Sequence, residues 1–231
     1  MNVRDVTLKQ IRRIMPDGKV LHLSLTGSRA FGWADDRFDY DVHGIIYRDN
    51  YWDWVHNGEQ GIDLNLWHLR HIFYDIQYQH FEMFQNMANP FFSTFDWKGM
   101  IELCTAKACD EYSILMQYDM LRRSEYSRTA LHCYRVVMIR VHWLETREFE
   151  LNIFKINEKW GFKMLQPLKE HYLGRRLTID YDEVWKELDQ LFEYFRELKA
   201  SVGEESLDVE RFSEWKTKVL EQLSENIEDS C

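Results

Sequence analysis

The chain has 231 residues, of which 29 are basic and 39 acidic, so its formal net charge is −10. This length fits one compact domain, alone or with a helical extension, and contents of 45% hydrophobic and 15% aromatic residues argue against disorder. The acidity excludes a protein that coats nucleic acid through clustered Lys and Arg, but it does not exclude nucleic acid held locally at a metal site.

Hydropathy patterns predict a helix over residues 3–15, followed by strands over 20–26, 38–47 and 61–66. From about residue 69 the period becomes helical, and the expected helices are 67–87, 98–120, 126–147, 161–172, 181–200 and 206–226. Strands confined to the first third of the chain, followed by helices, predict an α+β fold with a small sheet and a C-terminal helical domain.

The charge is unevenly distributed along the chain. Residues 204–231 hold nine acidic and three basic side chains, whereas residues 122–176 hold twelve basic and six acidic ones. We therefore expect three segments, namely a catalytic sheet domain over 1–97, a helical domain over 98–200 and an acidic C-terminal extension over 201–231.

Cysteine usage and the lack of long apolar runs indicate a cytoplasmic protein without a membrane partner. The four cysteines show no zinc-site spacing, so reduced thiols are expected. No signal-peptide core and no uncharged run of about 18 residues is present. His68 and His71 lie one turn apart without a third ligand at zinc-protease spacing, so we expect helix-surface or packing residues.

Three aspartates on neighbouring predicted strands form the candidate catalytic and metal site. Asp39 and Asp41 are two residues apart, so they point to the same face of their strand, and Asp63 on the next strand can converge on the same spot. Three carboxylates repel one another unless a cation neutralises them, and oxygen ligands select Mg²⁺ or Mn²⁺. Two such ions about 4 Å apart could hold nucleotide phosphates and activate a hydroxyl.

Gly27 and Ser28 end the first predicted strand and are candidate nucleotide-binding residues. Gly27 has no Cβ to keep a phosphate from the backbone, and Ser28 can donate a hydrogen bond to phosphate oxygens. The turn is not a Walker loop, because no Gly-Lys-Ser/Thr follows it. Asp63 would then ligate the catalytic metal or accept the proton of the acceptor hydroxyl.

The run LTGSRAFGWADDRFDYDVHGIIY, residues 25–47, resembles the DNA polymerase β-type nucleotidyltransferase superfamily. The shared pattern is a Gly-Ser turn, about ten residues, Asp-x-Asp, and a later Asp in an apolar strand. The longer motif Gly-Ser-Arg-Ala-aromatic-Gly is similar to the motif of a subfamily of predicted nucleotidyltransferases linked to RNA repair. Arg29 and Gly32 also match this motif. Residues 105–125 match no motif of that subfamily, which leaves the acceptor open.

The resemblance adds three nucleotide contacts to the candidate site. It places Arg29 beside the triphosphate, and it matches His132 and Arg135 to a His-x-x-Arg pattern on a C-terminal helix. The alternatives are a surface charge for Arg29 and a solvated helix face for His132 and Arg135.

The function implied is metal-dependent transfer of a nucleoside monophosphate from an NTP to a hydroxyl, with release of pyrophosphate. The resemblance implies an RNA 3′ end as the acceptor. The alternatives are a protein or small-molecule hydroxyl, which the acidic surface favours, and a non-catalytic nucleotide-binding module on the same fold.

Overall fold

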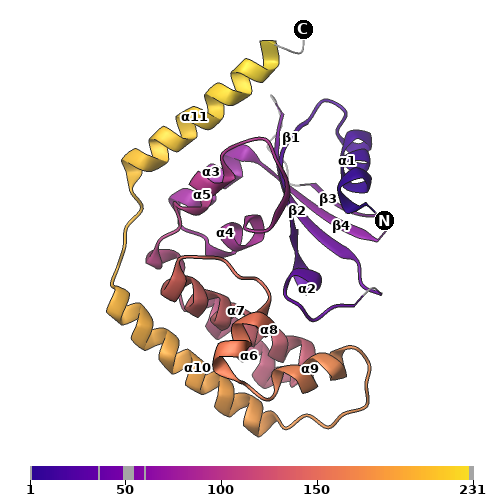
Figure 1. Ribbon diagram of the computed structural model, residues 1–231, viewed down its shortest axis with the longest axis vertical. Helices are drawn as coiled ribbons and strands as arrows, with labels where there is room; N and C mark the ends of the chain where they lie inside the picture. Colours follow the sequence, from indigo (N-terminus) through magenta and orange to yellow (C-terminus); the bar gives the residue numbers. More distant parts are fainter. Residues whose placement is uncertain (1, 36, 49–54, 60, 229–231) are drawn as a thin grey trace. The chain divides into compact units, whose positions relative to one another are not determined.

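The computed structural model describes residues 2–35, 37–48, 55–59 and 61–228. Its elements are, in chain order, α1 (Val3–Ile14), β1 (Lys19–Thr26), α2 (Gly27–Ala30), β2 (Tyr40–Tyr47), β3 (Val55–Glu59), β4 (Ile62–His68), α3 (Leu69–Gln77), α4 (Phe81–Met87), β5 (Pro90–Ser93), α5 (Trp97–Ile101), the 3₁₀ turn η1 (Ala106–Ala108), α6 (Tyr112–Ser124), α7 (Ser127–Thr146), α8 (Ile153–Trp160), α9 (Leu165–Tyr172), α10 (Tyr181–Val202) and α11 (Val209–Glu228). The predicted α+β class with a small mixed sheet and a helical C-terminal part is confirmed (Figure 1).

The chain divides into two compact units, which do not coincide with the predicted segments. The sheet unit contains the residues up to Gly27, then Phe38–Ala108, and the residues from Ser206 onward. The helical unit contains Ser28–Arg37 and Cys109–Glu205. The first boundary therefore falls near residue 108 instead of 97, and a short piece of the N-terminal region belongs to the helical unit.

The acidic α11 belongs to the sheet unit because one tryptophan anchors it there. Trp215 is 4% exposed, and its ring packs against the rings of Phe73 and Phe95 at centroid distances of 5.8 and 6.2 Å. Its Nε1 donates a hydrogen bond of 2.9 Å to the carbonyl oxygen of Asp96. The charge distribution alone indicated a separate extension, whereas burial of this large side chain ties the helix to the sheet unit.

The sheet has five strands in the order β3-β4-β2-β1-β5. Strands β2 and β4 are parallel neighbours, and the other pairs are antiparallel. Three of these strands, β1, β2 and β4, match the predicted ones, whereas β3 and β5 were not predicted. The parallel pair brings the start of β2 beside the start of β4.

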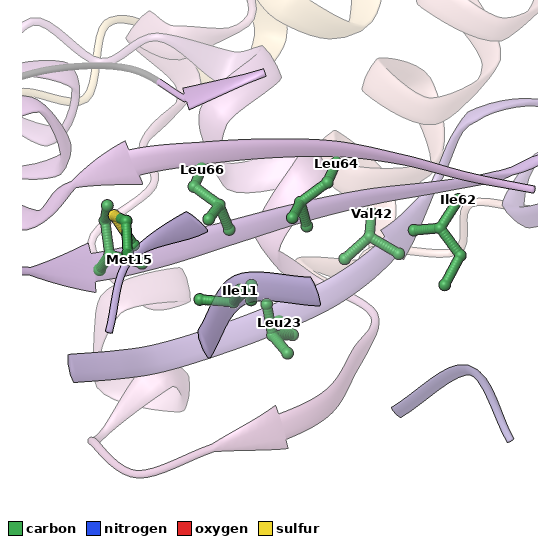
Figure 2. Close-up of a cluster of buried hydrophobic side chains, with 8 residues drawn as sticks. Ile11, Met15, Leu23, Val42, Ile62, Leu64 and Leu66 are labelled. Atoms are coloured by element: carbon green, nitrogen blue, oxygen red, sulfur yellow. The ribbon is translucent and has the colours of Figure 1, made fainter. Parts of the chain in front are cut away.

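Alternation, which is strict only in β4, gives the central strands one apolar face and a second face that carries the polar residues. On the apolar face, Leu23, Val42, Leu64 and Leu66 pack against Ile11 of α1 and against Met15, which follows this helix (Figure 2), and all six are at most 5% exposed. Successive strand residues point to opposite faces, so the polar alternates Asp41 and Asp63 point away from α1. Helices α3 and α4 contact β1, β2 and β4 within the same unit.

Helix α7 is the centre of the helical unit and is packed against α6, α8, α9 and α10. Its predicted range, 126–147, is confirmed within one residue at each end. Arg140, which interrupts the apolar pattern of this helix, is fully buried and donates hydrogen bonds to the Val136 carbonyl (3.0 Å) and to the Ser113 hydroxyl (2.7 Å).

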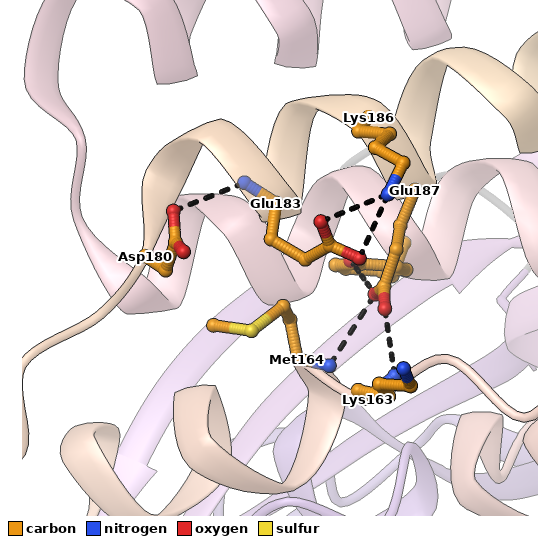
Figure 3. A network of polar contacts seen from close by, with 7 residues as sticks. Lys163, Met164, Asp180, Glu183, Lys186 and Glu187 are labelled. Carbon is orange, nitrogen blue, oxygen red and sulfur yellow. Dashed lines mark hydrogen bonds and ion pairs between the residues drawn. The ribbon is translucent and has the colours of Figure 1, made fainter.

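A buried carboxylate joins three elements of the helical unit (Figure 3). Glu187 of α10 accepts hydrogen bonds from the Tyr134 hydroxyl (2.5 Å), the Lys163 amide (2.7 Å) and the Met164 amide (3.3 Å). The two amides precede α9, so Glu187 satisfies backbone donors at the start of that helix while contacting α7.

Two of the helical predictions were too coarse. The expected helix over 67–87 is broken into α3 and α4 around Gln79, whose φ is 57°. The expected helix over 98–120 is α5, η1 and α6, and α8 was not predicted. Among the described residues, none of the helices is both long enough and apolar enough to cross a membrane.

Candidate functional site

Asp41 and Asp63 are paired partners on the neighbouring parallel strands β2 and β4. Adjacent strands are about 4.8 Å apart, and directly paired residues point to the same face, so the two carboxylates share one patch of the polar sheet face. Both side chains are partly buried. The predicted convergence of these two aspartates is confirmed by the strand register.

Gly27 lies directly against the Asp41 carboxylate. It follows Thr26, which is the partner of Asp41 in the antiparallel β1–β2 ladder. A methyl group built on Gly27 would lie 1.8 Å from Oδ2 of Asp41, and the φ of Gly27 is +66°. Only glycine fits both the left-handed backbone and this close approach. The turn and the carboxylate that the sequence grouped together are thus in contact.

Asp39 lies outside the strand on which it was predicted. Strand β2 begins at Tyr40, and the Asp39 side chain is exposed. Its Oδ1 is near Gly61, at 3.6 Å from the position that a Cβ there would take, and the Tyr40 amide donates a 2.8 Å hydrogen bond to the Gly61 carbonyl. Asp39 therefore lies beside Gly61, which leads into β4 and precedes Asp63 by two residues.

The donor set is suited to Mg²⁺ or Mn²⁺ bound together with a substrate. Within the described part of the chain, no three His, Cys, Asp or Glu side chains are grouped closely enough to hold a metal ion by themselves. Mg²⁺ is usually bound by only one or two carboxylates plus substrate phosphates and water. Asp41 and Asp63 are two carboxylates of this kind on one face of the sheet.

His43 is a site residue that the sequence reading missed. It follows Asp41 by two residues, which puts it on the same face of β2, and it is paired with Asn65 of β4. Burial lowers the pKa of His43 to about 4, although the negative charge of Asp63 raises it. Its buried Nδ1 makes no hydrogen bond with the described residues, and its ring lies 5.8 Å from the Trp67 ring. The same two-residue spacing that selected Asp39 and Asp41 would have found it.

The other predicted nucleotide contacts, Ser28, Arg29, His132 and Arg135, belong to the helical unit. Within that unit, the His132 ring meets the Trp33 ring edge-on at 5.2 Å, and the Arg135 guanidinium lies 4.9 Å from the centroid of Phe31. Burial lowers the pKa of His132 to about 3, so its imidazole is neutral. Both side chains are partly buried and hold the segment that follows Arg29, so neither belongs to a solvated helix face.

Two backbone contacts complete the attachment of this segment to the helical unit. The Ile153 amide donates to the Phe31 carbonyl (3.3 Å), and the Lys169 ammonium donates to the Gly32 carbonyl (2.8 Å). Gly32 has a φ of +89°, and a Cβ there would lie 2.4 Å from Oδ1 of Asn152. The packing within the helical unit thus explains Phe31 and Gly32, the last two residues of the motif Gly-Ser-Arg-Ala-aromatic-Gly.

His68 and His71 differ in their exposure to solvent. His68 is buried, and its Nδ1 accepts a hydrogen bond from the Arg70 amide at the start of α3 (3.2 Å), so its role as a packing residue is confirmed. His71 is exposed and lines a cavity of about 410 Å³ together with Asn65, Trp67 and Asp75.

Among solved structures, the chain has a distant likeness to a nucleotidyltransferase-like protein from Exiguobacterium sibiricum. The match covers 96% of this chain and 92% of that chain, with 13% sequence identity and a TM-score of 0.32. No protein-family model and no curated protein matches the chain. A likeness with this TM-score establishes neither fold nor activity, so the functional argument rests on the residues of the site.

Proposed function

We propose that the protein is a metal-dependent nucleotidyltransferase that moves a nucleoside monophosphate from an NTP to a hydroxyl, with an RNA 3′ end as the acceptor. The observation that carries the proposal is the register pair Asp41–Asp63 with the backbone of Gly27 against the Asp41 carboxylate. The resemblance of residues 25–47 to polymerase β-type nucleotidyltransferases supports the same reaction.

Each residue of the site has a role that its position supports. Asp41 and Asp63 would hold Mg²⁺ or Mn²⁺, with Asp39 as a further carboxylate at the entry to β4. When bound, these ions would offset the phosphate charge and lower the pKa of the acceptor hydroxyl. Gly27 would let the backbone of the turn lie against the Asp41 carboxylate, and Ser28 and Arg29, which follow it directly in the chain, would donate hydrogen bonds to phosphate oxygens.

In the proposed reaction, one bond to the α-phosphorus forms as another breaks, and a carboxylate accepts the proton. The acceptor oxygen forms a bond to the α-phosphorus, the bond from that phosphorus to the bridging oxygen breaks, and pyrophosphate leaves. The hydroxyl proton passes to the Asp63 carboxylate and from there to water. His132 and Arg135 would act within the helical unit by positioning the segment that follows Arg29.

The test is label transfer from α-³²P-labelled NTPs to total RNA or to total protein in the presence of Mg²⁺ or Mn²⁺. We expect transfer by the wild-type protein, and a loss of at least about a hundredfold in Asp41→Asn and Asp63→Asn, because each change removes a charge at the reacting centre. Asp119→Asn, which neutralises an exposed carboxylate of α6 paired with Arg123, is the matched control.

Digestion of the labelled product identifies the acceptor. Label that RNase releases supports an RNA acceptor, and label that protease releases shows protein nucleotidylation instead. A wild-type protein that binds NTP but transfers no label to either class would support the non-catalytic nucleotide-binding module and refute the transferase.

A further inference from the structure

The cavity beside Asp63 continues the polar face of the sheet beyond the carboxylates. Its described lining residues are Asn65 and Trp67 of β4 and His71 and Asp75 of α3. Asp63, Asn65 and Trp67 alternate along β4, so all three point to the same face. Residues two apart on a strand are separated by about 6.6 Å, so the cavity begins one such step from Asp63.

The lining chemistry suits a flat heteroaromatic ring with a polar edge. Trp67 offers an aromatic face, and the amide of Asn65 can donate and accept hydrogen bonds, which is the pairing that amide side chains make with adenine. Asp75 is mostly buried, with its side chain 15% exposed, and its Oδ1 shares a 2.7 Å hydrogen bond with Nδ1 of His80. A carboxylate can accept further bonds, for instance from an exocyclic amine.

The size and charge of the cavity fit a nucleobase and not a phosphate. Its volume of about 410 Å³ is within the range of small-molecule sites. Its described lining contains no Lys or Arg, which phosphate groups would require, and it contains one carboxylate that would repel them. His43 lies on β2 beside two of the lining residues, since it is paired with Asn65 and its ring is 5.8 Å from that of Trp67.

The strand order separates the two reactants of the proposed transfer. Gly27 follows the last residue of β1, Asp41 is the second residue of the central strand β2, and Asp63 is the second residue of β4, on the other side of β2 from β1. A triphosphate held at Gly27 would therefore approach Asp41 from the β1 side. A ligand in the cavity would approach from the β4 side, which is the side of the acceptor if Asp63 takes the acceptor's proton.

We propose that the cavity of Asn65, Trp67, His71 and Asp75 binds the terminal nucleobase of a single-stranded RNA acceptor and so places its sugar hydroxyl beside Asp63. The acceptor role rests on the proposed transferase function, whereas base binding in the cavity can be measured without any transfer. The base stacks on Trp67, and its polar edge meets Asn65 and Asp75.

The experiment measures binding of a 5′-fluorescein-labelled single-stranded RNA hexamer by fluorescence anisotropy, with Mg²⁺ and without NTP. Loss of one stacked base weakens single-strand binding by roughly tenfold, so Trp67→Leu is expected to raise the Kd about tenfold. Trp67→Phe keeps an aromatic face and should restore most of the affinity. Tyr74→Leu is the control, since it removes an exposed aromatic ring of α3 that does not line the cavity.

A parallel titration with a non-hydrolysable ATP analogue assigns the cavity to the acceptor. We expect the Kd for this analogue to stay within about twofold in Trp67→Leu. The proposal is overturned if the wild-type protein does not bind the hexamer, if Tyr74→Leu weakens binding as much as Trp67→Leu, or if Trp67→Leu weakens binding of the ATP analogue instead of the hexamer.

Failure of the proposed transfer has a different signature. Hexamer binding that depends on Trp67, in a protein that transfers no label, would refute the transferase and still support the base-binding cavity. Label transfer to protein that Trp67→Leu leaves unchanged would support the transferase and overturn the RNA-binding cavity.

Discussion

Replacing Gly27 by alanine tests the contact between the turn and the Asp41 carboxylate. The alanine Cβ would lie 1.8 Å from Oδ2 and 2.3 Å from Cγ of Asp41, whereas real Cβ contacts are essentially never shorter than 3.0 Å. The carboxylate must therefore move by about 1.2 Å, and the backbone must keep a φ of +66° with a side chain present. The left-handed backbone costs about 1–2 kcal/mol, and the forced repacking adds about 1–3 kcal/mol.

Gly161→Ala is the matched control because it separates these two contributions. Gly161 has a φ of +70°, and nothing lies within 4 Å of the position of its Cβ, so alanine there pays only for the backbone. Urea denaturation should show Gly27→Ala to be less stable than Gly161→Ala by about 1–3 kcal/mol. Label transfer should fall about a hundredfold in Gly27→Ala alone, as expected for a displacement of about 1 Å at a reacting centre. Equal stabilities and equal activities of the two variants would refute the argument.

Three further predictions concern the cores of the two units. The pKa of His132 is lowered from 6.5 to about 3, so below pH 6.5 the unfolded chain binds a proton that the native chain does not, and the unfolding free energy falls as the pH falls. From pH 6 to pH 5, the fall should be about 1 kcal/mol smaller in His132→Leu than in wild type, and equal slopes by urea titration would contradict this. Glu187→Gln puts an amide donor against two backbone donors and Tyr134, so denaturation should show a loss of about 2–3 kcal/mol, against about 1–2 kcal/mol for Tyr134→Phe. Trp215→Ala should lower the free energy of unfolding by about 3–5 kcal/mol and speed hydrogen exchange across α11. Arg211→Ala, which removes an exposed ion pair with Glu102, should lower it by less than about 1 kcal/mol. Similar losses of stability in both variants would argue against the anchoring role of Trp215.

Period-two alternation predicted the central part of the sheet correctly. The strands β1, β2 and β4 carry an uninterrupted apolar face, and the alternation in Ile62, Asp63 and Leu64 places an acid opposite that face without any knowledge of the partner strand. The pairing of Asp41 with Asp63 could not be predicted without β3. Strands β2 and β4 are parallel, and β3 lies between them in the sequence. Strand β3 carries no apolar alternation, so the sequence pattern did not reveal it.

The helical predictions failed where tertiary contacts override the period. Gln79 breaks the run 67–87 with a positive φ, and its side chain replaces the lost helical bonds by donating to the Ile76 and Leu103 carbonyls (2.8 and 3.1 Å). The oxygen of the same amide accepts from the Thr105 amide (2.8 Å). A residue that bonds across 26 positions of sequence leaves no local signal, so the apolar period continued through a real break.

The motif of residues 25–47 contains residues of both units, which the sequence alone does not distinguish. Gly27, Asp41 and Asp63 are held together by the ladder of the sheet unit, which fixes the candidate metal site. The residues between them, from Ser28 to Arg37, are held by the helical unit through Phe31, Gly32 and Trp33. The peptide bond between Gly27 and Ser28 thus joins the carboxylate site to a segment that is packed within the helical unit. On the proposed function, variants of His132 or Arg135 should change nucleotide binding through the Gly27–Ser28 turn, whereas variants of Trp67 should change acceptor binding alone.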